Sequence, residues 1–296
     1  MNPTRMKVLL VFGGSLFLSI IFNIWPAAIV FGFLTILGFF TTSKESNEEW
    51  EDQDTHADEG LNEHCYYGDE LKISNEKIIS ILIKRFPYFN SLDAAGKDKF
   101  LSRLNAFMKT KVFKTHDTRG FNEMPVLISA TAIQFSFGLE EFLLPRFQFI
   151  HFYPEEFINT KAPGKFLEGN VSARSINISW KHFLRGFFYP DDGQNVGLHE
   201  IAHAYYYQNF ISKEDIDKEF VNDFSRYSVT ANKIFEQEKM PGNDLFSEYA
   251  LTNSQEFWAE SAEMFFERPA ALNAAYPRLY AAMKELLNQD PLNTAA

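Results

Sequence analysis

The pentapeptide at residues 199–203 constrains the fold more than any other stretch, because its two histidines can act together only on a helix. His199 and His203 are four residues apart, so on an α-helix both imidazole rings leave one face about one turn apart. Glu200 directly follows the first histidine. Two imidazoles at this spacing can share a metal ion, and the carboxylate can reach a water on that ion. The motif therefore predicts a helix that carries part of a hydrolytic zinc site.

The flanking residues support a helix that is buried on one side. Val196, Ile201 and Ala204 are apolar and surround the polar triplet, which is typical of a helix packed on a core and open to a cleft. The turn-forming residues 190–193 precede it and supply a helix start signal. The alternative is a surface helix with two unrelated histidines, and a third metal ligand would decide between them.

The third ligand is expected on a second helix, since hydrolytic zinc usually takes three protein ligands and one water. Residues 254–269 are predicted to form a helix that ends near Pro269. Its carboxylates form one stripe, made of Glu256, Glu260, Glu263 and Glu267. We expect Glu267 to be solvated. Glu256 and Glu260 flank apolar residues suited to burial, and buried carboxylates need a cation or a hydrogen-bond donor.

Several short motifs resemble one known family. They are Asn195-Val-x-Leu-His-Glu-x-Ala-His, Tyr249-Ala-x-Thr-Asn-Ser-x-Glu256-Phe-Trp-Ala, Glu263-x-Phe-Phe-Glu-x-Pro269, and Pro277-x-Leu-Tyr with Asp290-Pro291. Together they resemble the Mlc titration factor A family of zinc-dependent peptidases, which is related to the catalytic domain of anthrax lethal factor. The resemblance spans residues 76–291 and leaves the N-terminal quarter uncovered.

The resemblance implies a role for most residues of these motifs. It makes His199, His203 and Glu256 the ligands of one zinc ion per chain, and Glu200 the catalytic glutamate. Tyr249 falls where the family places a tyrosine facing the substrate, and its hydroxyl would help to stabilise an oxyanion.

Two further glutamates follow the third ligand. Glu260 lies one turn beyond Glu256, so we expect it to accept a hydrogen bond from the second nitrogen of a zinc-binding histidine. Glu263 matches a family position, but the sequence assigns it no role.

The predicted function is that of a membrane-anchored zinc metallopeptidase, a hydrolase acting on a peptide or protein substrate. The resemblance also implies an alternative, namely a non-enzymatic or dual-role interaction protein that sequesters a transcriptional regulator. Nucleic acid is not an expected partner, because residues 43–70 carry a net charge of −10 out of the whole-chain −11 and the rest is nearly neutral.

Residues 175–180 alternate apolar and polar side chains, as a half-buried strand does. The segment precedes the zinc helix. The periodicity alone favours an ordinary strand of the sheet, and the alternative is the edge strand above the metal. An edge strand in that place can pair with an extended substrate and recognise its main chain.

Residues 8–40 contain no charged side chain and are preceded by Arg5 and Lys7. This length exceeds a bilayer's hydrocarbon thickness of about 30 Å. We expect either one kinked span or a hairpin of segments 8–22 and 27–40, and we favour the hairpin. With a cytoplasmic N-terminus, a single span would export the enzyme, whereas a hairpin would keep it on the cytoplasmic side of the cell membrane.

The domain prediction follows from these features. Residues 1–41 form the membrane anchor, 42–72 an acidic disordered linker, and 73–296 the peptidase domain. Cys65 is the only cysteine, so no intramolecular disulfide forms.

The fold class is predicted as α+β, mainly helical, and the resemblance makes it zincin-like, with a small mixed sheet beside the zinc helix and the transmembrane segments before it. Helices are expected at 78–89, 97–112 and 124–137, and a strand at 146–153.

Overall fold

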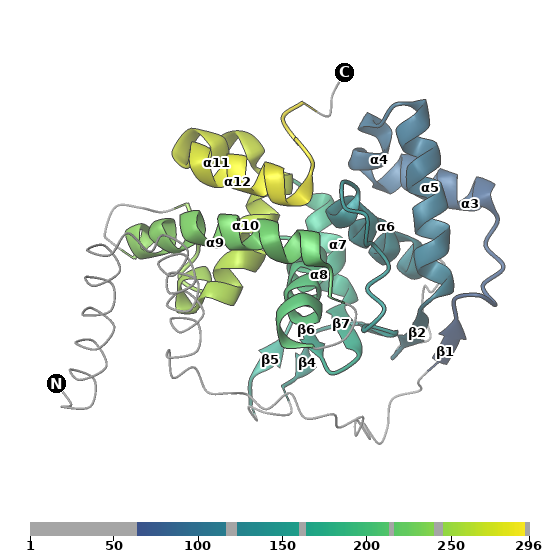
Figure 1. Cartoon of the computed structure of the whole chain (residues 1–296). Coiled ribbons are helices and arrows are strands. Elements are labelled where there is room, and N and C mark those ends of the chain that lie inside the picture. The colour runs from purple at the N-terminus through teal and green to yellow at the C-terminus, as the bar shows by residue number, and fades with distance from the viewer. Residues whose placement is uncertain (1–63, 117–122, 160–163, 213–215, 240–244, 294–296) are drawn as a thin grey trace, which may run out of the picture. The chain divides into compact units, whose positions relative to one another are not determined.

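The computed structural model describes residues 64–116, 123–159, 164–212, 216–239 and 245–293 (Figure 1). Its helices are α3 (Asn75–Arg85), α4 (Pro87–Ser91), α5 (Ala94–Lys109), α6 (Met124–Ser136), α7 (Trp180–Phe188), α8 (Val196–Tyr206), α9 (Lys218–Glu238), α10 (Ser254–Glu267), α11 (Pro269–Ala275) and α12 (Pro277–Leu287). A π-helical turn (Tyr207–Ile211) continues α8, and a 3₁₀ turn (Ala250–Thr252) precedes α10.

The strands form two sheets. They are β1 (His64–Tyr67), β2 (Val112–Thr115), β3 (Phe149–Tyr153), β4 (Phe157–Ile158), β5 (Phe166–Leu167), β6 (Gly169–Ser172) and β7 (Ser175–Ser179). The larger sheet has the order β1-β2-β3-β7-β6 and is mixed, because β2, β3 and β7 are parallel while β1 and β6 are antiparallel to their neighbours. β4 and β5 form a separate hairpin.

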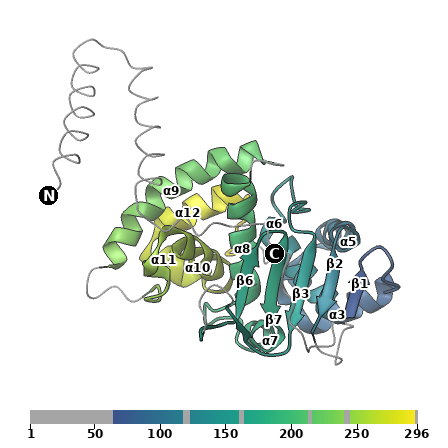
Figure 2. The ribbon, with the colours of Figure 1, turned by 90° about the horizontal axis from the view of Figure 1, so that it is seen from below.

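One face of the larger sheet is covered by helices. Figure 2 shows the sheet face on, with α3, α5 and α6 behind it and α8 alongside β6. The covered face is apolar and includes Phe113, Ile150, Phe152, Ile176 and Ile178, all buried. α6 lies in the middle of this core and is buried almost all round, as its uncharged sequence predicts.

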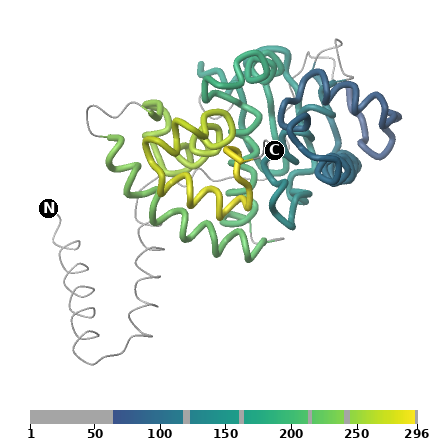
Figure 3. Tube along the Cα trace, turned by 90° about the horizontal axis from the view of Figure 1, so that it is seen from above, coloured from purple at the N-terminus to yellow at the C-terminus, as the bar shows by residue number. Residues whose placement is uncertain are grey.

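The C-terminal helices pack on the other side of α8 from the sheet (Figure 2). Figure 3 shows α12, in yellow, running alongside α9, in green. α10 contacts α8, α9 and α12, so it connects the C-terminal helices to α8, the helix that carries the histidine motif. The mainly helical α+β prediction with a small mixed sheet is confirmed.

Several predicted boundaries differ from the structure for local reasons. The helix predicted at 78–89 is two helices, because Pro87 cannot donate a backbone hydrogen bond and disfavours a helical Phe86. The helix predicted at 97–112 starts at Ala94, where Asp93 caps the backbone of Gly96, and ends before strand β2 begins at Val112.

The sheet corrects one prediction and decides between the two alternatives for a second segment. Residues 64–67, assigned from sequence to the disordered linker, form strand β1 on the edge of the sheet. Residues 175–179 do form a strand, but β7 lies between β3 and β6, so the edge strand beside α8 is β6. β6 contains Gly169 and Asn170, residue types with low strand propensity, and its sequence gives little strand signal.

The predicted anchor at 1–41 and the first part of the linker lie outside the described residues. Within the described ranges, none of the helices has both the length and the apolar character that crossing a bilayer requires.

Candidate metal centre

The site lies between two helices whose first turns are fixed by asparagine caps. The side chain of Asn195 accepts a hydrogen bond from the backbone of Leu198 at 3.1 Å and starts α8. Asn253 accepts from the backbone amides of Gln255 and Glu256, both at 2.9 Å, and starts α10. These caps satisfy amides that a helix start leaves unpaired, so each helix begins at a defined residue.

Trp258 joins the two helices behind the site. Its ring is buried, and its indole Nε1 donates to the backbone carbonyl of Ala202 at 2.9 Å. The contacts of Glu256 with His203, and of Glu263 with Asn195, show that α10 runs antiparallel to α8. A polar group that is both buried and paired fixes the rotation of α10 about its axis.

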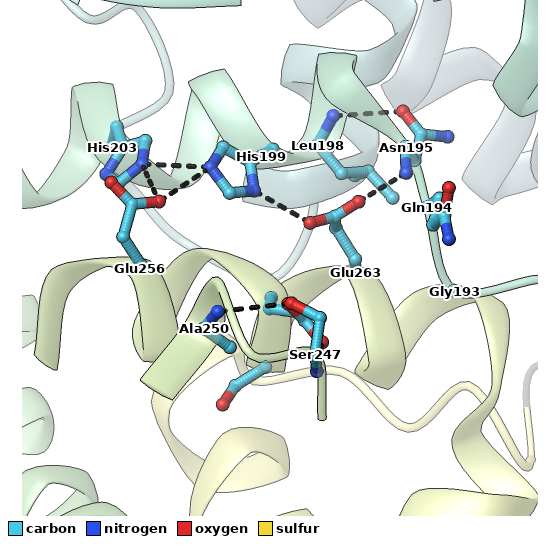
Figure 4. A network of polar contacts seen from close by, with 12 residues as sticks. Gly193, Gln194, Asn195, Leu198, His199, His203, Ser247, Ala250, Glu256 and Glu263 are labelled. Carbon is cyan, nitrogen blue, oxygen red and sulfur yellow. Dashed lines mark hydrogen bonds and ion pairs between the residues drawn. The ribbon is translucent and has the colours of Figure 1, made fainter. Parts of the chain in front are cut away.

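Three side chains converge between the helices (Figure 4). The Nε2 atoms of His199 and His203 are 3.0 Å apart, and each lies near the same carboxylate oxygen of Glu256, at 3.1 and 3.2 Å. One ligand atom from each residue falls within 4.8 Å of the others. Two imidazole nitrogens and one carboxylate oxygen form the donor set of a hydrolytic zinc site.

The second nitrogen of His199 shows why this cluster suits a cation. Nδ1 of His199 faces Oε1 of Glu263 at 2.7 Å, so in a neutral ring the proton lies on Nδ1 and donates to Glu263. Nε2 then directs a lone pair at the oxygen of Glu256 and the ring of His203. A positive charge among these three groups offsets the repulsion between the lone pair and the carboxylate. Without a metal, a second proton on His199 supplies that charge, and a bound metal ion would take its place.

Glu263 has the role that the sequence predicts for Glu260, because it contacts the second nitrogen of His199. Besides His199, the carboxylate of Glu263 accepts a hydrogen bond from the backbone amide of Asn195, so it connects the start of α8 to the ring of His199. Glu260 instead accepts two hydrogen bonds from Ser247, both at 2.6 Å. Figure 4 shows Ser247 on the side of α10 away from the histidines. The prediction for Glu260 is wrong.

The expectation of a solvated Glu267 is also wrong. Its carboxylate accepts hydrogen bonds from the side chain of Asn195 at 2.8 Å and from the backbone of Gly193 at 3.1 Å. Burial raises the pKa of Glu267 to about 8. Glu263 and Glu267 together fix the turn that leads into α8.

Glu200, the carboxylate of the His-Glu-x-x-His motif, is deeply buried. It is 4% exposed, and among the described residues its Oε2 is buried without a hydrogen-bond partner. Burial raises its pKa to about 8. The backbone of Gly169 in β6 packs directly against it, since a Cβ there would lie 2.6 Å from Oε1. A buried carboxylate that lacks a donor is compatible with a nearby cation, which would stabilise the charged form.

The electrostatics of the other site groups follow from the same contacts. Burial favours the neutral carboxyl of Glu256, but hydrogen bonds from His199 and His203 prevail and hold its pKa well below the usual range. Burial also opposes protonation of His199, yet Glu263 and Glu256 raise its pKa above the ordinary value. Burial lowers the pKa of His203, which favours the neutral ring that can bind a metal.

Tyr249 lies near the histidines of the cluster. Its side chain is 59% exposed, and its ring centre is 6.4 Å from that of His199. It therefore stands close to the histidines and remains accessible, as a group that meets a substrate must be.

A helix with the His-Glu-x-x-His motif, packed against a second helix that supplies a carboxylate, defines a metal-dependent peptidase. The comparisons agree with this class. The family model described as glucose-regulated metallo-peptidase M90 matches residues 70–287, and the chain belongs to that family, which is the Mlc titration factor A family. None of the curated proteins compared with the chain matches it. The family resemblance is confirmed, and it indicates a peptide or protein substrate.

Proposed function

We propose that this protein is a zinc-dependent metallopeptidase with His199, His203 and Glu256 as ligands of one zinc ion. The observation that carries the proposal is the convergence of their donor atoms within 4.8 Å, with the Nε2 atoms of both histidines facing the same carboxylate oxygen of Glu256. Zinc is the ion that this donor set favours among the common hydrolytic metals. Glu263 fixes the orientation and tautomer of His199.

The chemistry of the chain's own residues follows from their positions. When bound, zinc supplies Lewis acidity that polarises a peptide carbonyl and lowers the pKa of a water. Glu200, one residue from the first ligand, accepts the proton of the attacking water and passes it to the departing amine. The hydroxyl of Tyr249 donates to the oxyanion that forms at the carbonyl.

The substrate is proposed to bind as an extended strand along β6. Within the described part of the chain, β6 is hydrogen-bonded to β7 on one side and ends the sheet on the other. Its first residue, Gly169, packs against Glu200. A peptide that pairs with the outer side of β6 through main-chain hydrogen bonds would therefore pass close to Glu200, the proposed catalytic glutamate.

The test is zinc content and peptide cleavage in the full-length protein. Glu200→Gln should keep about one zinc per chain and lose cleavage, whereas Glu256→Ala should weaken zinc binding as well. Cleavage by the Glu200→Gln protein would overturn the assigned base. A folded wild-type protein that binds no metal and cleaves nothing would favour the regulator-binding alternative.

We also propose that residues 8–40 anchor the enzyme in the cell membrane, with the catalytic domain on the cytoplasmic side. The support is the absence of charge over a length sufficient to span a bilayer. Alkaline extraction of membranes should leave the protein in the pellet, and protease added outside intact cells should spare the domain. Release by alkali would refute the anchor, and digestion from outside would refute the hairpin topology.

A further inference from the structure

The β4–β5 hairpin lies next to the strand on which the substrate is proposed to bind. It occupies the connection between β3 and β6, and only Glu168 separates its last residue, Leu167, from Gly169. At about 3.3 Å per residue, Phe166 is within roughly 10 Å of Gly169 along the chain. Figure 1 shows β4 and β5 beside β6. A peptide that extends along β6 past Glu200 reaches this hairpin within a few residues.

The base of the hairpin is fixed to the rest of the domain. The ring of Phe157 stacks on that of Tyr153 in β3, with centres 4.4 Å apart. His182 in α7 contacts both ends of the hairpin, since its Nε2 lies 2.5 Å from Glu156 and its Nδ1 lies 3.1 Å from Glu168. The contact with His182 lowers the pKa of Glu156 to about 2. The hairpin is therefore held in a defined position beside β6.

The other face of the hairpin exposes two large apolar side chains. Ile158 and Phe166 are direct cross-strand partners, so they lie side by side on the face opposite Phe157. Ile158 is 62% exposed and Phe166 is 66% exposed. An adjacent pair of large apolar groups left in water beside a binding strand suits a contact with an apolar side chain.

We propose that Ile158 and Phe166 form a specificity site that receives a large apolar side chain of the peptide within three residues of the cleaved bond. The site rests on the proposed peptidase function and names its substrate class, namely peptides with a Leu-like or Phe-like residue near the cleavage point. The continuity of the hairpin with β6 carries the argument, because a peptide paired with β6 and extended beyond Gly169 would run toward Phe166 and Ile158.

The experiment compares matched peptides on the full-length protein. A single Leu is placed at each position from three before to three after the cleaved bond in a polar background, and kcat/KM is measured for each. At one position Leu should be preferred over Ser by about tenfold, as expected for a partly buried apolar contact. Phe166→Ser and Ile158→Ser should each reduce that preference to near unity. Val229→Ser, at a 45% exposed position on α9, is the matched control and should keep the preference.

A second measurement separates this site from the peptidase function. Binding of each Leu peptide of the series, and of the Ser peptide, is followed by fluorescence anisotropy on the Glu200→Gln protein, with and without Phe166→Ser. A preference that survives both hairpin substitutions, or equal binding with and without Phe166→Ser, overturns the specificity site. If wild-type protein cleaves no peptide but Phe166→Ser still weakens binding, the peptidase proposal fails and the apolar site stands.

Discussion

Gly169→Ala should inactivate the enzyme without removing its metal. Gly169 has no positive φ, so an alanine is compatible with its backbone conformation, and any effect must come from the added Cβ. That Cβ would lie 2.6 Å from Oε1 and 2.7 Å from Cγ of Glu200, and 2.8 Å from a methyl of Val196. All three contacts are with α8, so the new methyl pushes on the helix that carries the motif.

The magnitude follows from these distances. An ordinary contact between heavy atoms needs about 3.5 Å. Either the side chain of Glu200 must therefore move by about 1 Å, or β6 and α8 must move apart by that distance. Glu200 is 4% exposed and has little free space to enter. A displacement of about 1 Å in a catalytic group costs on the order of 100-fold in rate, and overpacking costs about 1–3 kcal/mol of stability.

The assay measures kcat, bound zinc and urea unfolding in parallel. Val171→Ala is the matched control, because Val171 is a buried residue of the same strand, and its truncation costs comparable stability but adds no atom to the space between β6 and α8. It should retain near-normal kcat and zinc. Normal turnover by Gly169→Ala would refute the close packing of Glu200 against β6, and loss of zinc would show that the ligands had moved instead.

Three other predictions concern metal affinity, pH and packing. Glu263→Gln should weaken zinc binding by about 10- to 100-fold in chelator competition, whereas Glu260→Gln should leave it unchanged; equal effects would contradict the assignment of the histidine partner. Burial lowers the pKa of Lys111 from 10.5 to about 7, so between these values the unfolded chain binds more protons and stability rises with pH. Lys111→Met should remove this rise between about pH 7 and pH 9 in urea unfolding, and an unchanged slope would count against it. Trp258→Ala should cost about 3–5 kcal/mol in the same assay, and a loss below 1 kcal/mol would mean that the helices repack.

The sequence predicted the two site helices because their signals are local. The four-residue spacing of the histidines and the apolar residues around them need only one helix to be interpreted. The third donor, Glu256, could be assigned only through the family resemblance. Spacing alone does not distinguish it as a metal ligand from the neighbouring glutamates of the same helix.

Glu263 rather than Glu260 contacts His199, and local spacing alone did not predict this because it ignores how the two helices pack. Glu263 is seven residues from Glu256, which returns it to within about 20° of the same helix face, whereas a four-residue step is about 40° away. That signal was present, but its use required the antiparallel packing of α10 on α8, which brings Glu263 to His199 and Asn195. Strand β6 escaped prediction for a related reason, because pairing with β7 rather than intrinsic propensity makes it a strand.

The chain connectivity between the two site helices would give a bound metal ion a role in folding. His203 and Glu256 are 53 positions apart in sequence, and α9 lies in the segment between them. An ion held by both closes this segment into a loop, and a permanent cross-link of that length removes chain entropy worth about 4 kcal/mol from the unfolded state. The ion would thus act as a reversible cross-link, and a metal-depleted chain is expected to open first in the segment that the ion encloses.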